Sequence, residues 1–330
     1  MDKKKIYIAC SADRNYARPM AVMLVSFLEN LDKEYSADIK ILDGGILGED
    51  KGRINVTLGR YNCIFEFVPV KTEQFKNAIG ENSHLSATAY ARLLLPDLFS
   101  DIEKIIYLDC DLIARGDIAK LWETDLAGKA VAAVPILFSF YYDLLFEIFK
   151  IPKDNGYFNS GVMVMDLKKM RGTGFVQKTL DFIAANQSRL TNVADQDVLN
   201  ALLYDDFKKL DLKWNVTVES YIGRGYENTA VAKYGFYSQQ EFLSAKKDPQ
   251  IVHFDGALKS WHFGFCHPYK NLYDKYLAKT PFKNSKIFDA KKLFSFYAYY
   301  CLKFLPSPIY RMILPSLKKI YKNKNFRPLK

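Results

Sequence analysis

The sequence of 330 residues predicts an α/β fold built on a mostly parallel, mixed sheet. Two observations predict it. Short apolar runs of strand length alternate with longer segments whose apolar residues recur at helical spacing. The composition, with 49% hydrophobic and 25% charged residues, is typical of a globular chain that buries a core. Strands separated by helix-length segments form β-α-β units, and their strands lie parallel in one sheet.

This alternation fills the first third of the chain. Strands are predicted over residues 5–10, 38–42, 63–68 and 104–108, and helices over residues 20–31, 49–60 and 88–95. Pro19 opens the first helix, since the N–H that proline lacks has no partner in a first turn. Pro96 should end the third helix, because a proline inside a helix removes a hydrogen bond. Ligands of such sheets bind beyond the carboxyl ends of the strands, so the residues after each strand are the first candidates for a site.

The net charge of +10 is concentrated at one end of the chain. Residues 281–330 hold twelve Lys or Arg and one acid, Asp289, whereas residues 1–280 hold 35 basic and 36 acidic residues. A protein that follows a nucleic-acid backbone needs basic charge along its binding face, so we expect no nucleic-acid partner. The sequence therefore predicts a near-neutral folded domain over residues 1–280 and a basic, aromatic-rich tail over residues 281–330.

The tail interleaves Lys and Arg with Phe and Tyr, and its apolar residues recur at roughly helical spacing. Basic amphipathic helices with aromatic anchors suit an anionic bilayer surface. We therefore expect an α-helical tail that associates the protein peripherally with an anionic membrane surface. A helical tail packed on the folded domain and a disordered basic end are the alternatives.

The cysteines and the apolar segments favour a cytoplasmic protein. The five cysteines form no CxxC pair, which argues against a disulfide framework or a zinc ribbon. The apolar run near the N-terminus has about five residues, fewer than the ~7–15 of a signal peptide. The longest apolar stretch, residues 130–146, contains Pro135 and Asp143 and is shorter than the ~20 residues of a membrane span.

Two acids follow the predicted strand over residues 104–108. In an extended chain, the side chains of Asp109 and Asp111 point the same way and can meet one cation. Two carboxylates that close need such a partner, or one of them takes up a proton. Oxygen ligands suit Mg²⁺, Mn²⁺ or Ca²⁺. A pair of solvated loop acids is the alternative.

His253 follows another short strand-like run. A lone histidine at such a place is more often structural than ligating. Gly256 and Lys259 change that balance, since glycine permits a close backbone approach and lysine supplies a point charge for phosphate. One histidine with two carboxylates favours Mn²⁺ over Mg²⁺. His262 and His267 lie in an aromatic stretch, and we expect them to pack there.

Six stretches of the chain resemble the retaining glycosyltransferases of family 8, which include bacterial lipooligosaccharide galactosyltransferases and glycogenin. The matching stretches are IACSADRNYARPMAVMLVSFLEN (8–30), SATAYARLLLPDLF (86–99), KIIYLDCDLIARGDIAKLWETDL (104–126), GYFNSGVMVMDLKKMR (156–171), ADQDVLN (194–200) and VHFDGALKSWH (252–262). They occur in the family's order and together cover residues ~5–275. A single DxD motif is weak evidence, whereas six motifs in order are strong.

The resemblance implies a GT-A-type fold with a single Rossmann-like nucleotide-binding domain. It implies transfer of a hexose, glucose or galactose, from a UDP-sugar to a saccharide or lipid-linked oligosaccharide acceptor, with retention at the anomeric carbon. The bacterial branch points to lipopolysaccharide biosynthesis in the cell envelope. The expected location is then the inner face of the cell membrane, with Mn²⁺, or alternatively Mg²⁺, as the cofactor.

The resemblance also assigns residue roles. It implies metal ligands at Asp109, Asp111 and His253, uracil and ribose contacts at Asp13 and Asn15 with Ala12 beside the base, a donor contact at Arg92, sugar-side residues at Asn159, Asp195 and Gln196, diphosphate contacts at Gly256 and Lys259, and His84 lining the sugar and acceptor cleft. The residue placed under the sugar, Gln196, is an amide and a poor nucleophile. We therefore favour front-face substitution, with Asp195 holding sugar hydroxyls.

Structural alternatives exist for these residues. Asp13 and Asn15 could cap the following helix, and Arg92 could pair with Asp97 or Glu103. Asn159 could be a turn residue. The Asp195-Gln196 pair could be an acidic helix start, which the helix dipole favours.

Two other function classes remain open at this point. A sugar-nucleotide pyrophosphorylase also uses metal carboxylates on an α/β sheet, but residues 9–16 lack the glycine-rich loop that it needs. A non-catalytic carbohydrate- or nucleic-acid-binding module is the other alternative. Cys110, between the two acids, departs from the family pattern, and we expect it to face the opposite way and pack.

Overall fold

The computed structural model describes residues 3–71, 75, 87–137, 147–152, 155–186, 190, 194–222, 225–256, 259–262, 265 and 267–283. The predicted site residue His84 and the predicted basic tail from residue 284 onward lie outside these residues. Among the helices of the described residues, none has both the length and the apolar character needed to cross a membrane.

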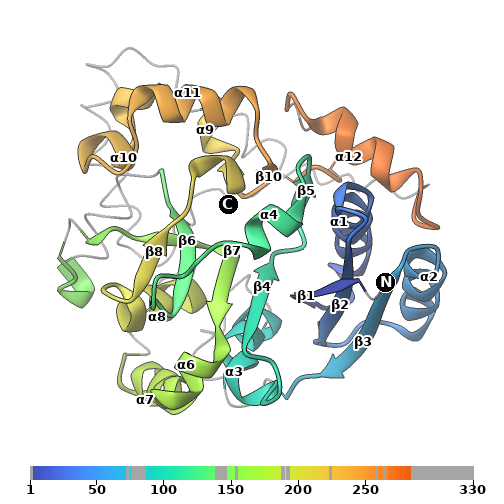
Figure 1. Cartoon of the computed structure of the whole chain (residues 1–330), viewed down its shortest axis with the longest axis horizontal. Coiled ribbons are helices and arrows are strands. Elements are labelled where there is room, and N and C mark those ends of the chain that lie inside the picture. The colour runs from blue at the N-terminus through green and yellow to red at the C-terminus, as the bar shows by residue number, and fades with distance from the viewer. Residues whose placement is uncertain are drawn as a thin grey trace.

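A large mixed sheet forms the centre of the molecule (Figure 1). Within the described residues it has seven strands in the order β3-β2-β1-β4-β7-β6-β8. Their bounds are β1 Lys4–Ala12, β2 Tyr35–Asp43, β3 Cys63–Pro69, β4 Lys104–Leu108, β6 Val131–Pro135, β7 Phe158–Asp166 and β8 Phe207–Lys209. Strand β7 runs antiparallel to both of its neighbours, and the other pairs are parallel. The predicted mostly parallel mixed sheet is confirmed.

The central strands of this sheet are buried on both faces, because successive strand residues enter two different cores. Ile8 and Cys10 of β1 join a core with residues of α1 (Ala17–Asn30), α2 (Gly48–Leu58) and α12 (Lys270–Leu277). Ala9 and Tyr107 join the opposite core. That core is covered by the 3-10 helix η2 (Ala87–Leu94) and by α3 (Leu95–Leu98), α6 (Leu167–Gly172), α7 (Phe175–Asn186) and α8 (Ala194–Leu203). A strand buried on both sides has a continuous apolar run, as residues 105–108 do.

A second, smaller sheet has the order β5-β10-β9 within the described residues. Its strands are β5 Leu112–Ala114, β10 Ile251–His253 and β9 Val216–Thr217. Strand β10 pairs antiparallel with β5, and this register places His253 opposite Leu112. The small sheet therefore brings a residue from late in the chain next to the acids that follow β4. Shorter elements complete the fold: α4 Ile118–Trp122, η4 Leu212–Trp214, α9 Glu219–Ile222, η5 Tyr226–Asn228, α10 Ala230–Lys233 and α11 Gln239–Lys247.

The predicted elements of the first third are confirmed, with two corrections. Helix α1 begins at Ala17 rather than Met20, so Pro19 lies inside its first turn. The predicted α-helix over residues 88–95 is wrong in kind, since η2 is a 3-10 helix. Pro96 does not end it but lies in the first turn of α3. A proline is tolerated there because the first turn of an α-helix leaves its N–H groups without partners.

Asn200 of α8 joins this helix to strand β7. Its Oδ1 accepts the N–H of Phe158 at 2.7 Å, and its Nδ2 donates to the carbonyl of Phe158 at 2.9 Å and to that of Gln196 at 2.8 Å. The side chain is fully buried. One amide side chain thus pairs with the backbone N–H and carbonyl at the start of β7 and fixes the position of the first turn of α8.

Replacing Asn200 with Ala should destabilise the protein by about 2–3 kcal/mol, because the buried N–H and carbonyl of Phe158 lose their partners. Urea unfolding followed by circular dichroism measures the change. Asn55→Ala, at an exposed position of α2, is the matched control and should stay within about 0.5 kcal/mol of the parent. Equal stabilities of the two variants would contradict this role of Asn200.

Candidate active site

The site is built where the two sheets meet. Asp109 directly follows β4, and its N–H donates to the carbonyl of Gly161 in β7 at 2.8 Å. Asp111 directly precedes β5, and its carbonyl accepts the N–H of Phe254, which follows β10, at 2.9 Å. The chain between the two acids forms a turn, not the extended segment that the sequence suggested. The two sheets hold the carboxylates together instead.

Asp109, Asp111 and His253 form a cluster. Each offers one ligand atom, and these atoms all lie within 4.8 Å of one another. Nε2 of His253 is 3.2 Å from Oδ1 of Asp111, and both residues are buried. Two carboxylates and an imidazole are a donor set that suits Mn²⁺. The structure thus brings the three predicted metal ligands together.

The two carboxylates differ in how strongly neighbouring positive groups stabilise their charged form. Burial acts to raise the pKa of Asp111, but Lys259 and His253 outweigh it and hold this pKa far below its ordinary value. Burial raises the pKa of Asp109, and Asp111 raises it further against the opposing effect of Arg92. A cation between the two acids would stabilise both in the charged form.

Gly161 leaves room for the cluster. A Cβ atom at this position would lie 2.5 Å from Cε1 of His253 and 2.8 Å from Oδ2 of Asp109. Its backbone lies outside the left-handed region, so space and not conformation requires the glycine. The donor set and this cleared space fit a bound divalent cation.

Lys259 lies against the acid cluster. Its Nζ is 2.5 Å from Oδ2 of Asp111, and its side chain is 15% exposed. The N–H of Lys259 donates to Nδ1 of His262 at 2.9 Å, which fixes the start of this segment. Gly256, two residues after Phe254, has a φ of +96°, which glycine adopts most readily. The lysine that was predicted to contact phosphate therefore lies beside the acid cluster.

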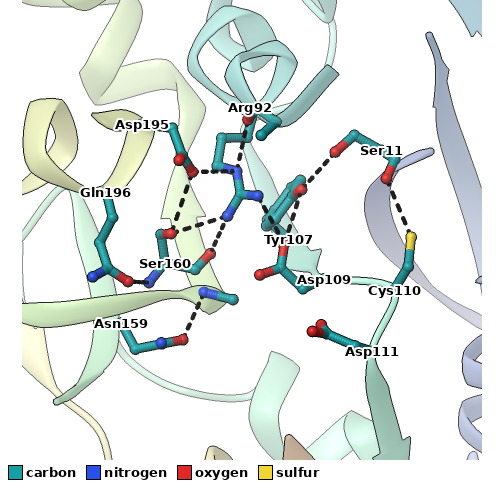
Figure 2. Close-up of polar contacts among 12 residues, drawn as sticks. Ser11, Arg92, Tyr107, Asp109, Cys110, Asp111, Asn159, Ser160, Asp195 and Gln196 are labelled. Atoms are coloured by element: carbon teal, nitrogen blue, oxygen red, sulfur yellow. Dashed lines mark hydrogen bonds and ion pairs between the residues drawn. The ribbon is translucent and has the colours of Figure 1, made fainter. Parts of the chain in front are cut away.

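Arg92 connects the acid cluster to the start of α8 (Figure 2). Its Nη2 donates to Oδ1 of Asp109 at 2.8 Å, and its Nε lies 3.2 Å from Oδ2 of Asp195. Its guanidinium stacks over the ring of Tyr107, with Cζ 4.4 Å from the centroid. Burial acts to lower the pKa of Arg92, but Asp109 and Asp195 outweigh it and raise it. Arg92 thus pairs with acids of the site, and not with Glu103, which pairs with Lys168.

Ser160 of β7 contacts two of the three predicted sugar-side residues (Figure 2). Its N–H donates to Oε1 of Gln196 at 3.0 Å, and its hydroxyl lies 3.5 Å from Oδ2 of Asp195. Asp195 and Gln196 lie in the first turn of α8, so the helix-start alternative describes their backbone correctly. Asn159 is a strand residue and not a turn residue. The structure brings all three predicted sugar-side residues to the first residues of β7.

The residues after β1 show a local role. Ala12 ends β1 and is buried. Oδ1 of Asp13 accepts the N–H groups of Asn15 at 2.8 Å and Tyr16 at 3.2 Å, which forms a turn directly before α1. Helix α1 has no side-chain cap, so the capping alternative is wrong for Asp13, which instead closes the turn before the helix. A contact of Ala12, Asp13 or Asn15 with a nucleotide stays a prediction.

Two residues of the site were not predicted from the sequence. Asn215 contacts His253 of the cluster at 2.9 Å and donates to Oδ1 of Asn159 at 2.8 Å. Tyr107 of β4 lies two residues before Asp109, so alternation along the strand was a signal for it.

Cys110, which was predicted to pack, is buried and donates to the carbonyl of Ser11 at 3.2 Å, and burial raises its pKa well above the ordinary value. Its predicted packing role is confirmed.

A mixed sheet with an acid cluster at its strand ends and a small second sheet defines a GT-A-type glycosyltransferase fold. The solved structure of the galactosyltransferase LgtC in complex with donor and acceptor sugar analogs has the same fold, with a TM-score of 0.69 and 23% identity. The superposition covers 84% of this chain and 96% of that one.

The family follows from sequence comparison. The model of glycosyl transferase family 8 matches residues 7–264, and the chain belongs to this family. General stress protein A of Bacillus subtilis (strain 168) is 34% identical over 278 residues, which cover 83% of this chain and 94% of that protein. A lipopolysaccharide 1,2-glucosyltransferase of Escherichia coli (strain K12) is 27% identical over 300 residues, which cover 88% and 82%.

Gly161→Ala should lower the affinity for Mn²⁺ by about 10–100-fold, because the added methyl group displaces His253 or Asp109. Electron paramagnetic resonance of free Mn²⁺ measures this affinity. Gly52→Ala is the matched control, since a Cβ there meets open space on α2. An unchanged affinity in Gly161→Ala would argue against a cation site at this cluster.

Proposed function

We propose that this glycosyltransferase moves glucose or galactose from a UDP-sugar to a saccharide or lipid-linked oligosaccharide acceptor, with retention at the anomeric carbon. The observation that carries the proposal is the cluster of Asp109, Asp111 and His253 with a basic side chain on each flank, the buried Arg92 and the half-buried Lys259. Fixed positive charge beside a cation site suits a diphosphate donor. The related lipopolysaccharide glucosyltransferase supports a role in building the cell envelope.

Asp109, Asp111 and His253 are the residues that would hold Mn²⁺, or alternatively Mg²⁺. Such an ion, when bound, supplies Lewis-acid stabilisation of the charge that develops on the leaving diphosphate. The chain adds its own charge to this effect, because Lys259 already contacts Asp111. Gly256 would be the other contact to the diphosphate. Ala12, which ends β1, and Asp13 and Asn15, which follow it, would hold the uracil and ribose.

The contacts of Gln196 and Asp195 favour front-face substitution. Oε1 of Gln196 already accepts a hydrogen bond from the backbone of Ser160, and an amide is a poor nucleophile. Asp195 is ion-paired with Arg92 and has a side chain that is only 6% exposed. An acid held in this way is suited to orient sugar hydroxyls. In this route the acceptor hydroxyl attacks on the face that the phosphate leaves, and the leaving phosphate oxygen takes its proton.

The remaining assignments concern the acceptor and the membrane. His84 would line the cleft that receives the acceptor, as the family resemblance implies. The basic tail would hold the enzyme against the inner face of the cell membrane, since each basic residue near an anionic surface adds about 1 kcal/mol. The protein would then act in the cytoplasm on acceptors displayed at that surface.

Incubation with Mn²⁺ and UDP-glucose, UDP-galactose or UDP-N-acetylglucosamine should release UDP slowly from one donor without acceptor, because water can replace the acceptor hydroxyl. Chromatography of the nucleotide products measures this release. Asp109→Asn should lower it by at least about 100-fold through loss of a metal carboxylate. Asp205→Asn, which changes an exposed acid outside the site, should leave it intact. No release from any of the three donors would refute the proposed donor class.

Removal of the tail should abolish binding to anionic vesicles while donor hydrolysis persists. The shortened chain should end after residue 283, because Phe282 packs in the core and lies under Arg53 of α2. Co-sedimentation of both chains with phosphatidylglycerol vesicles, at low and high salt, measures the difference. Equal binding of the two chains would remove the tail from the proposal.

A further inference from the structure

Asn215 is a buried residue that has no role in the proposed reaction so far. It lies between η4 and β9 and is 1% exposed. Strand β9 pairs with β10 so that His253 lies opposite Thr217, two residues after Asn215. Its Oδ1 is 2.9 Å from Nδ1 of His253, and its Nδ2 is 2.8 Å from Oδ1 of Asn159. One amide therefore touches a proposed metal ligand and a proposed sugar-side residue.

The polarity of these contacts is fixed by the backbone. The N–H of Gly161 can only donate, and it donates to Oδ1 of Asn159 at 2.9 Å. The atom of Asn159 that faces Asn215 is therefore an oxygen, and Asn215 must present its N–H group to it. The carbonyl oxygen of Asn215 then faces His253, and an oxygen at this place requires a proton on Nδ1.

We propose that Asn215 is a positioning residue that keeps a proton on Nδ1 of His253 and so presents Nε2 to a divalent cation. The inference rests on the proposed metal-dependent function. Nε2 is the ring atom that faces the acids, 3.2 Å from Oδ1 of Asp111. Imidazoles that bind metals characteristically donate their other N–H to a neighbouring oxygen, which fixes the ring and its tautomer. Here that oxygen belongs to a neutral amide.

A neutral amide suits this position better than a carboxylate. Asp109, Asp111, Asp195 and Asp255 already bring four acids to the region, and a further buried charge beside them would be unfavourable. A carboxylate would also have no N–H for Asn159. Asparagine serves both neighbours, so one side chain sets the orientation of the cation side and of the sugar side of the site.

Two variants separate the two contacts. Asn215→Leu removes both, and we expect Mn²⁺ affinity, measured by electron paramagnetic resonance, to fall by about 10–100-fold. Asn215→Asp keeps an acceptor for His253 and should bind Mn²⁺ about as well as the wild type, while its KM for the donor sugar rises because Asn159 is released. Asn30→Leu is the control, since Asn30 hydrogen-bonds Ser26 and Tyr276 outside the site. Circular dichroism verifies that each variant is folded.

The ring protons of His253 are observed directly in the full chain labelled with ¹⁵N-histidine, in which His253→Gln identifies the signal among four histidines. We expect Nδ1 to carry a proton in the wild type with and without Mg²⁺. An unprotonated Nδ1 would overturn the inference. So would wild-type Mn²⁺ affinity in Asn215→Leu, or an equal loss of Mn²⁺ affinity in the Leu and Asp variants. Absence of Mn²⁺ binding by the wild type would instead refute the proposed function, and the ring protons would still test the role of Asn215.

Discussion

Two carboxylates held close together away from bulk water are the constraint on which this structure depends. Asp109 and Asp111 cannot both stay charged in a buried place without positive charge nearby. Arg92 supplies it on one side and Lys259 on the other, each at hydrogen-bonding distance. Arg92 is buried and Lys259 is half-buried, so their positive charges would be unfavourable without these acids. Removing one partner of such a pair leaves an uncompensated charge, so acids and cations hold one another in place.

The topology of the sheets makes this charge cluster possible. Strand β7 runs antiparallel between β4 and β6, which brings its first residues, including Asn159 and Gly161, to the end of β4 where the acids begin. Strand β10 pairs with β5 and delivers His253 from a distant part of the sequence. Buried helices and strands fix each of these positions, so the geometry of the site is set by packing on both faces of the sheet and not by flexible loops.

Local signals in the sequence predicted a large part of this arrangement. The strand over residues 104–108 was predicted at its observed bounds, and the acids after it do form a cluster. The reason given for the cluster, an extended chain with both acids on one side, was wrong, because the chain turns at Cys110. The pairing of strands in the two sheets aligns the acids instead. The partners of Arg92 and the role of Asn215 had no local signal, since those contacts join residues far apart in the chain. Pro96 misled the prediction because a helix end and a helix start look alike around a proline.

The contact between Lys259 and Asp111 links two binding events. The ammonium group of Lys259 has three N–H donors, so it can contact Asp111 and a diphosphate at the same time. A cation bound to Asp111 and a diphosphate bound to that cation and to Lys259 would each stabilise the position of the other. Each ligand would therefore raise the affinity of the other by the same factor. In the proposed enzyme the lysine links the two ligands, so that neither ligand alone gains the full affinity that the pair has together.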